Sequence, residues 1–261
     1  MFYSISEFGR TLVGAVKEIG RIYMFSGEIL VAIPGAIAKR ENTLEQMVSI
    51  GIGSFPLVFV TAIFTGGVAA VQAAYQFQNF VPMRYLGSAI ERSVVIELGP
   101  VLTALVVGGR VGASIAAELG TMKVTEQIDA MESLGISPMR YLVAPRFIAA
   151  TLMLPVATIF ADLLAMLGAF AVSHHSLDMR AQTFMEGVRM FFYARDIFGG
   201  LIKSFFFGMI IATMGCYHGF RTEGGAEGVG IATTRAVVYS CVLILVTDYF
   251  LASALFRTLW G

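Results

Sequence analysis

Residues 50–74 read IGIGSFPLVFVTAIFTGGVAAVQAA, and no charged side chain interrupts them. They form the centre of a longer run, residues 46–83, that contains no Asp, Glu, Lys or Arg. A helix needs about 20 predominantly apolar residues to cross the hydrocarbon core of a bilayer. The stretch is therefore predicted to be a membrane-spanning helix. It is continuously apolar and does not alternate as barrel strands do, so a β-barrel is not expected.

The composition of the whole chain indicates the same class of protein. Of its 261 residues, 57% are hydrophobic and only 14% are charged, whereas soluble domains carry about 25% charged residues. The mean hydropathy is +0.77. Too few charged side chains remain to cover a surface in water, which excludes a soluble enzyme and a disordered chain. Basic and acidic residues are equal at 18 each, so no basic excess favours a nucleic-acid partner.

Four further apolar stretches follow, and each contains one charged residue. A charge at bilayer depth is costly unless it faces a cavity or a partner. On this argument we expect Asp162 and Asp248 to have structural roles. Together with residues 50–74 these stretches predict five membrane-spanning helices in an all-α integral membrane protein. The four stretches are 93–109 with Glu97, 147–172 with Asp162, 197–220 with Lys203, and 236–256 with Asp248.

The amino-terminal segment, residues 1–45, has a different pattern from the five-helix domain of residues 46–261. Its apolar residues follow the period of a helix, with charged residues on the intervening face. This pattern predicts a helix that lies in the membrane interface. Residues 24–38 are apolar but interrupted by Glu28 and Pro34, so a re-entrant segment and a continuing interfacial helix both remain open. The periodic apolar residues are Ile5, Phe8, Leu12, Val16, Ile19 and Tyr23.

The distribution of Lys and Arg predicts the orientation in the membrane. With five spans, 11 of these residues fall on the side of the amino terminus and 7 on the opposite side. Positively charged loops remain on the cytoplasmic side. We therefore expect a cytoplasmic amino terminus and a carboxyl terminus on the outside.

The loop between the second and third predicted spans contains the signals of a short helix. Thr125 can cap it, the acidic residues Glu126 and Asp129 lie in its first turn, and Gly135 occupies the C′ position. A helix of about nine residues, ~14 Å long, is predicted. Such a helix can insert into a groove of a partner protein or simply connect two spans, and the pattern leaves both open. Its apolar side consists of Ile128, Met131 and Leu134.

Motifs of catalysis and metal binding are absent from the sequence. No phosphate-binding GxxxxGK[ST] loop occurs, so the chain is not expected to hydrolyse ATP by that route. It also has no HExxH, GxSxG or CxxC motif. The adjacent histidines His174 and His175 point about 100° apart on a helix and make a poor metal site. We expect no catalytic residue, no metal and no cofactor.

Several ordered motifs resemble those of the MlaE family of permeases, the membrane subunits of MCE-type lipid-transport ABC systems. The match runs from about residue 51 to residue 256 and covers nearly the whole chain. The motifs are Glu97-Leu98-Gly99-Pro100, Gly109-Arg110-Val111-Gly112-Ala113-Ser114, Ala117-Glu118-Leu119-Gly120, Thr125-Glu126-Gln127, Pro145-Arg146-Phe147 and Ala232-Thr233-Thr234-Arg235-Ala236-Val237-Val238.

The resemblance implies an architecture and a set of partners. It implies an interfacial helix followed by five membrane helices in a homodimeric, non-catalytic permease of the bacterial inner membrane. The permease would move phospholipids and maintain the lipid asymmetry of the outer membrane. Its partners would be a cytoplasmic ABC ATPase, a periplasmic hexamer of MCE-domain subunits and phospholipid, and a small cytoplasmic STAS-type subunit is left open. The ATPase would dock on the short loop helix, through Glu126, Gln127, Asp129, Met131 and Glu132.

Carried over position by position, the family's lipid pocket corresponds to Gln72, Phe80, Glu97 and Leu98. Phe80 stands where the best-known bacterial relative has tyrosine, and Ile96 stands where that relative has arginine. The second departure leaves Glu97 without an adjacent cation. Its candidate partners are then Arg92 and a lipid amine, and a structural ion pair inside the bundle is the alternative to a lipid contact.

Two other functions compete with the permease. One is an ion-coupled secondary transporter that uses Glu97, Asp162 and Asp248 as proton or ion sites. The other is an intramembrane enzyme, but the sequence contains no recognisable pair of nucleophile and base. Dependence of transport on nucleotide distinguishes the ABC permease from the secondary transporter.

Overall fold

The protein is an α-helical bundle with a sixth long helix lying across one of its ends. The computed structural model describes residues 2–37, 40–77 and 81–260, and every regular element in these ranges is helical. The α-helices are α1 Phe2–Ile37, α2 Arg40–Phe77, α3 Leu86–Ser93, α4 Gly99–Val124, α5 Gln127–Ser133, α6 Ala144–His175, α7 Ala181–Met190, α8 Ala194–Phe220 and α9 Gly225–Leu255. Short 3₁₀ or π turns lie at η1 Met83–Tyr85, η2 Val94–Leu98, η3 Met139–Val143 and η4 Phe256–Trp260.

Five helical segments of the described chain have the length and composition needed to cross a membrane. Each contains one of the five stretches predicted from the sequence, so the predicted fold class is confirmed. The segments are Arg40–Phe77, Met83–Val124, Met139–His175, Ala194–Phe220 and Gly225–Thr258.

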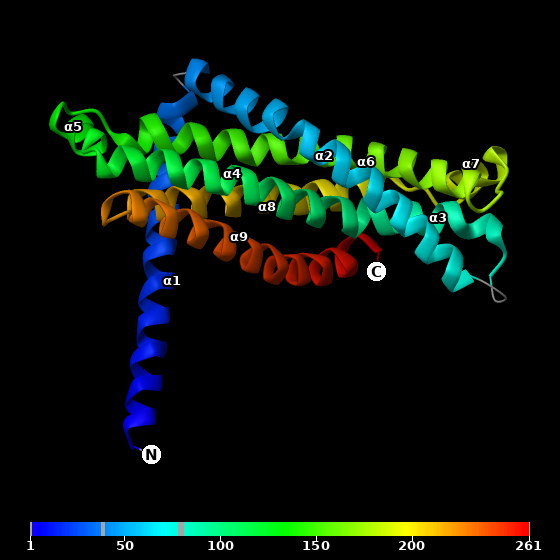
Figure 1. The fold of residues 1–261 in the computed structure, drawn as a ribbon, viewed down its shortest axis with the longest axis horizontal. Helices are drawn as coiled ribbons and strands as arrows, with labels where there is room; N and C mark the ends of the chain where they lie inside the picture. The colour runs from blue at the N-terminus through cyan, green and yellow to red at the C-terminus, as the bar shows by residue number, and fades with distance from the viewer. Residues whose placement is uncertain (1, 38–39, 78–80, 261) are drawn as a thin grey trace.

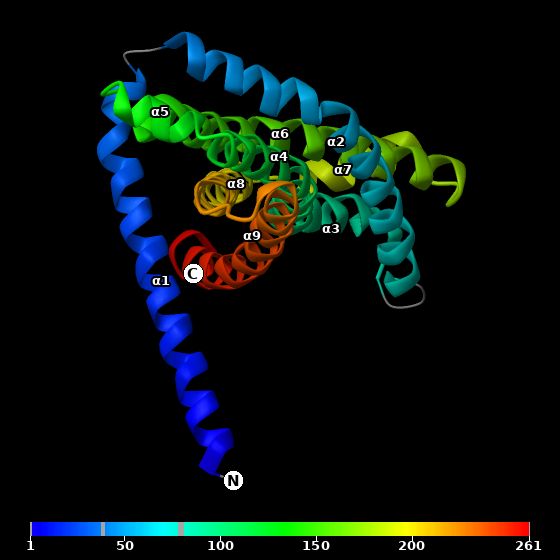
Figure 2. The same ribbon diagram turned by 60° about the vertical axis from the view of Figure 1, so that its left-hand side comes forward.

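The five segments run side by side (Figures 1 and 2). Helix α8 is the most buried of the five. It packs against α4, α6 and α9, whereas α2 packs chiefly on α6. Small residues allow the closest of these approaches. A Cβ atom on Gly66 of α2 would collide with the backbone carbonyl of Ala165 in α6, and one on Gly168 would collide with the carbonyl of Ile63. Glycine therefore brings the two backbones into contact, as is common between membrane helices.

The second spanning segment extends well beyond the predicted stretch 93–109. Helix α4 continues to Val124, because charged residues that break the hydropathy signal are engaged within the bundle. Arg110 donates to the hydroxyl of Ser54 at 2.8 Å, and Glu118 pairs with Arg146 at 3.0 Å. The hydropathy pattern alone cannot distinguish such bound charges from the end of a helix.

Helix α1 is continuous from Phe2 to Ile37 and includes Pro34. Residues 24–37 belong to this helix, and residue 38 lies outside the described residues. In both views the helix runs crosswise to the bundle, with its amino-terminal half projecting away from it (Figures 1 and 2). Its carboxyl-terminal part packs on η3 and α6.

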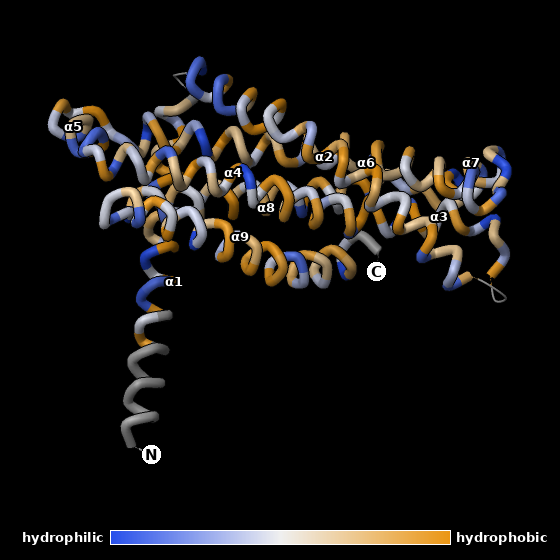
Figure 3. The backbone as a smooth tube through the Cα atoms, viewed as in Figure 1, coloured by the Kyte–Doolittle hydropathy of each residue, from blue (hydrophilic) through white to orange (hydrophobic). Residues whose placement is uncertain are grey.

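The two ends of the bundle are built differently. Helix α5 lies at the end where α1 crosses, and α3 and α7 pack together at the opposite end (Figure 1). Polar residues gather at both ends, and apolar residues follow the helices between them (Figure 3). This distribution is what a bilayer around the middle of the bundle requires.

Candidate functional site

Three charged side chains from three different spanning segments meet inside the bundle. The Lys203 ammonium of α8 lies 2.6 Å from Oε2 of Glu97 and 3.0 Å from Oδ1 of Asp248 in α9. We call Glu97, Lys203 and Asp248 the charged triad. The sequence placed these residues in separate spans, and only the packing of α4 and η2 against α8 and α9 brings them together.

Burial within the triad is uneven. The Lys203 side chain is fully buried, whereas 20% of the Asp248 side chain and 44% of the Glu97 side chain are exposed. Two carboxylates face one ammonium, so the ionised triad carries a net charge of −1. The lysine is therefore neutralised inside, and excess negative charge is presented at the surface through Glu97.

The triad identifies the ion-pair partner of Glu97, and this partner is not Arg92, which was one of the predicted candidates. Lys203 is that partner, and Arg92 instead lies 3.5 Å from Asp196 at the start of α8. The sequence could have pointed to Lys203 as this partner, because it is the one Lys or Arg within the five predicted stretches. Its partners could not be identified without the helix packing.

A π turn positions Glu97. Residues Val94–Leu98 form η2, directly before Gly99 and Pro100 at the start of α4. The carbonyl of Val95 lies against Gly200 of α8, where a Cβ atom would collide with it. Such π turns within helices frequently occur at functional sites, because they redirect side chains. Here the turn and Gly200 together let Glu97 reach Lys203.

Asp162 does not join the triad. Its carboxylate lies against Gly99, so closely that a Cβ atom at this position would overlap Oδ1. Oδ1 has no hydrogen-bond partner among the described residues, and the same holds for both carboxylate oxygens of Glu91, which is only 2% exposed. Glu91 was not among the residues predicted from the sequence to lie at a site. Both acids line an apolar cavity of about 830 Å³ between α3, α6 and α7.

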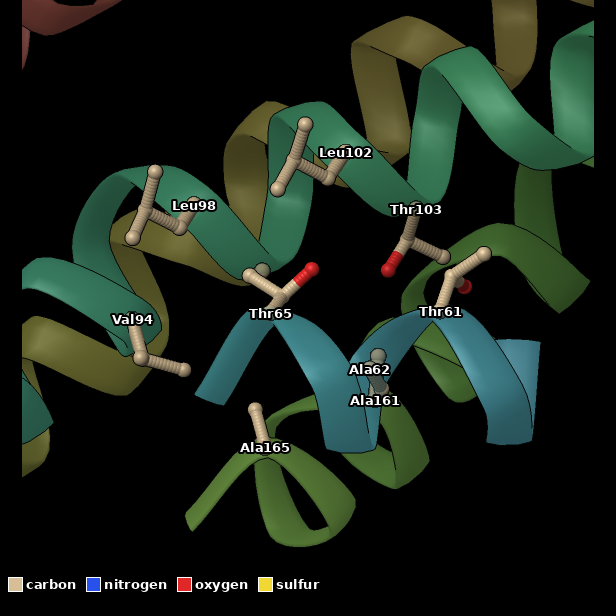
Figure 4. Close-up of a pocket in the computed structure, with 10 residues that line it drawn as sticks. Thr61, Ala62, Thr65, Val94, Leu98, Leu102, Thr103, Ala161 and Ala165 are labelled. Atoms are coloured by element: carbon tan, nitrogen blue, oxygen red, sulfur yellow. The ribbon is translucent and has the colours of Figure 1, made fainter. Parts of the chain in front are cut away.

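Leu98 lines a much smaller cavity between α2, α4 and α6 (Figure 4). Figure 4 shows Leu98 and Leu102 next to each other on one side of the cavity and Thr65 on the facing helix. The volume of this cavity is about 10 Å³, which is the room that about one water molecule needs. No lipid chain fits into it. Gln72 is exposed on α2 and is not part of the triad, and Phe80 lies outside the described residues.

The predicted loop helix is present as α5, but it is shorter and capped differently. It comprises seven residues, Gln127–Ser133. The prediction that Thr125 caps it is wrong, because the Thr125 hydroxyl donates back to the carbonyl of Thr121 in α4. The chain turns instead at Glu126, whose left-handed conformation (φ 61°) reverses the direction from α4 into α5.

The carboxyl-terminal end of α5 is the predicted one. Gly135 has φ +73°, and its amide donates to the carbonyl of Glu132, while the amide of Ile136 donates to the carbonyl of Met131. These two bonds form a Schellman motif, which needs a left-handed residue at C′. Glycine adopts that conformation without steric cost.

The polar residues of α5 are exposed at the end of the bundle. Glu126, Gln127, Asp129 and Glu132 are exposed, Met131 is half-buried, and Ile128 is buried. Asp129 pairs with Lys123 at 2.6 Å. Leu134 was predicted on the apolar side with Ile128, yet it is 77% exposed. The helix thus presents two acidic residues with no described ion-pair partner, Glu126 and Glu132, beside an uncovered leucine.

Several residues of the sequence motifs join spanning helices to one another. Arg146 of α6 is buried and donates both to Glu118 of α4, at 3.0 Å, and to the carbonyl of Leu142, at 2.9 Å. Arg110 links α4 to Ser54 of α2. These contacts join α4 to both α2 and α6.

Comparisons with known proteins found one matching family model and several similar chains. The family model described as "Permease MlaE" matches residues 43–254. A "Probable ABC transporter permease protein" of Rickettsia bellii is 36% identical over 97% of both chains. The Synechocystis "Probable ABC transporter permease protein slr1045" is 39% identical over 98% of this chain and 94% of its own. "Protein TRIGALACTOSYLDIACYLGLYCEROL 1, chloroplastic" of Arabidopsis thaliana is 35% identical over 90% of this chain and 67% of its own.

Proposed function

Because the chain belongs to the MlaE permease family, we propose that it moves phospholipids as the membrane-spanning subunit of an ABC transporter. It is a multi-pass membrane permease subunit. The proposed cargo is phospholipid passing between bacterial membranes, a traffic that maintains the lipid asymmetry of the outer membrane. A separate cytoplasmic ATPase supplies the energy, and this chain performs no chemical step.

The charged triad is the observation that carries the proposal. Ionisable groups at bilayer depth are rare because they are costly, and those that occur often mark a substrate pathway. A phospholipid headgroup combines a phosphate with polar or ammonium groups. Lys203 is fully buried between Glu97 and Asp248, and the partly exposed carboxylates of Glu97 and Asp248 are the charges that ammonium or hydroxyl groups of a headgroup can contact. A headgroup that slides along α9 can exchange contacts with these charges.

A second copy of the chain would complete the lipid path. The spanning segments α2 and α9 are the least buried of the five, each with 22% of its apolar window buried. Large apolar side chains cover both, including Phe64 on α2 and Phe250 on α9. In the proposed homodimer these faces enclose phospholipid between the copies, and Glu97 opens towards it.

The two ends of the bundle suit different partners. We place the end with α1 and α5 in the cytoplasm of a bacterial cell, with α1 in the interface of the inner membrane. The ATPase docks on α5 through Glu126, Gln127, Asp129, Met131 and Glu132. The hexamer of MCE-domain subunits sits over α3 and α7 in the periplasm. A small STAS-type subunit would belong on the cytoplasmic side with the ATPase.

Purification with the native partners tests the cargo directly. The complex is extracted in detergent, washed, and its bound lipids are identified by mass spectrometry. We expect phospholipid in stoichiometric amounts, and less of it with Glu97→Gln, in which Asp248 remains as the partner of Lys203. Recovery of no phospholipid would overturn the proposal.

The ion-coupled transporter is tested in liposomes that contain the permease, its partners and a fluorescent phospholipid. We expect transfer of the lipid only when ATP is present. Transfer driven by a pH or sodium gradient without nucleotide would favour the secondary transporter, in which Glu97, Asp162 and Asp248 carry ions.

A further inference from the structure

A polar cavity of about 830 Å³ lies at the α5 end of the bundle, away from the triad. We call it the basic cavity. Helix α1 forms one wall, the ends of α4 and α8 form another, and the first turns of α9 close it. Four basic and two acidic side chains line it, an excess of two positive charges. They are Arg21, Lys123, Arg221 and Arg235, with Glu18 and Glu223.

The wall formed by α1 is held in place by Glu18. The Tyr217 hydroxyl donates to Oε1 of Glu18 at 2.7 Å. Arg21 and Arg221 lie 3.3 and 3.9 Å from Oε2, and the Arg221 guanidinium stacks 4.7 Å above the Tyr217 ring. One carboxylate is thus shared by two arginines and a tyrosine. It cannot neutralise the cavity as a whole.

No carboxylate among the described residues pairs with Arg235 in this way. Arg235 is exposed on α9, lines the cavity, and makes no ion pair or hydrogen bond with any other described residue. Lys123 is already paired with Asp129 at 2.6 Å. Arg235 and Arg221 line the same cavity, and arginine suits phosphate because the parallel N–H groups of its guanidinium match the oxygens of that group.

The surroundings of the cavity indicate that the phosphate belongs to a lipid. Ile231 and Tyr239 line the cavity, and exposed apolar residues continue along α9 beyond it. Val238, Val242 and Leu245 are each more than half exposed. A hydrocarbon chain attached to a phosphate in the cavity would lie on this apolar face, which leads towards Asp248.

We propose that the basic cavity binds the phosphate headgroup of an anionic phospholipid, with Arg235 and Arg221 as its contacts; that the lipid belongs to the cytoplasmic leaflet rests on the orientation proposed above. Basic pockets between membrane helices on the cytoplasmic side hold anionic lipid headgroups by the same electrostatics. The site is separate from the triad. Lipid binding there requires neither the ATPase nor transport, so it can be measured without assuming the proposed function.

The full chain in dodecyl maltoside micelles is titrated with dioctanoyl phosphatidylglycerol or dioctanoyl phosphatidylcholine. Binding is read from the rise in unfolding temperature, since a ligand that binds only the folded state stabilises it. We expect phosphatidylglycerol to bind at least about tenfold more tightly than phosphatidylcholine. Arg235→Gln should lower the affinity for phosphatidylglycerol about tenfold, which is the loss expected for one hydrogen bond to a charged group.

Arg189→Gln is the matched control, because Arg189 is an exposed arginine at the opposite end with no described ion pair or hydrogen bond. It should bind phosphatidylglycerol as the native chain does, and Arg235→Lys should retain part of the affinity. Equal affinity for the two lipids, or equal losses with Arg235→Gln and Arg189→Gln, would overturn the proposal.

A competition arm distinguishes lipid from free phosphate. Millimolar inorganic phosphate should not displace phosphatidylglycerol, because the chains add contacts along α9. Complete displacement would assign the site to soluble phosphate and overturn the lipid claim. If transport fails in liposomes while this binding persists, the proposed function fails and the basic cavity stands.

Discussion

The ammonium of Lys203 lies 2.6 Å from a carboxylate oxygen of Glu97, although 106 positions separate the two residues in the sequence. Lys203 is fully buried and also touches Asp248 at 3.0 Å. A buried cation requires such partners, because desolvation would otherwise cost several kcal/mol. The triad is thus a structural necessity for Lys203, and through the exposed part of Glu97 it is also available to a ligand.

Removing the cation should cost more than removing all three charges. Lys203→Met leaves Glu97 and Asp248 facing each other without compensation, and we expect a loss of about 3 kcal/mol in unfolding free energy. The triple variant Lys203→Met, Glu97→Gln, Asp248→Asn should recover most of that stability. Thermal unfolding in detergent measures both. A Lys203→Met protein as stable as the native chain would show that the ion pairs do not form.

The contact between α2 and α6 depends on glycine. Gly66→Ala should destabilise the bundle by about 1–3 kcal/mol, because the new methyl group would collide with the carbonyl of Ala165. Gly109→Ala is the control, since nothing lies within 4 Å of the added carbon. It should be neutral or slightly stabilising. Equal unfolding temperatures for the two variants would contradict this packing.

Charge reversal on α5 tests the docking of the ATPase. Glu126→Lys with Glu132→Lys changes two exposed acids that make no described ion pair, so the fold should survive. Co-purification of the ATPase should be lost if α5 is its docking element. The matched control at the other end is Asp178→Lys with Glu186→Lys, which also combines one residue of positive φ with one helical acid. Retention of the ATPase by the α5 variant would refute the docking assignment.

Acidification should release α1 from α8. The hydrogen bond from Tyr217 is the main cause that lowers the pKa of Glu18 below its ordinary value of 4.5, and Arg21 and Arg221 act in the same direction. A lowered pKa in the folded state means that the ionised form stabilises the contact. This stabilisation is complete above about pH 4.5 and is lost as the pH falls through the lower, folded-state value.

Hydrogen exchange of the α1 amides around Glu18 measures this release. The α1 amides of the native chain should be better protected than those of Glu18→Gln. This extra protection should be constant between pH 5 and 8 and should disappear under stronger acid, as expected for the titration of a carboxylate. Tyr217→Phe should make the protection of the α1 amides more like that of Glu18→Gln, because it removes the main cause of the lowered pKa of Glu18. Identical protection of the native chain and Glu18→Gln at pH 7 would contradict the proposed tether.

The limits of prediction differ between parts of the molecule. The five spans and the Schellman end of α5 follow from local patterns, namely runs of apolar residues and a glycine at a helix end. The extent of α4 and the start of α5 do not. Arg110 and Glu118 look like the end of a span until Ser54 and Arg146 are placed beside them. Glu126 enters the left-handed region because α4 and α5 must reverse there.

By itself, the sequence determined that this is an all-helical membrane protein with five spans, because crossing a bilayer imposes a length and an apolar composition on each segment. It also marked which charges lie inside those spans. Only the tertiary structure decided which of those charges meet, joining Glu97 and Asp248 to Lys203 while keeping Asp162 apart. The basic cavity, too, exists only because the tertiary structure brings α1, α8 and α9 together. The reason is physical: burial of one residue is a local property, whereas an ion pair or a cavity depends on how whole helices are rotated against one another.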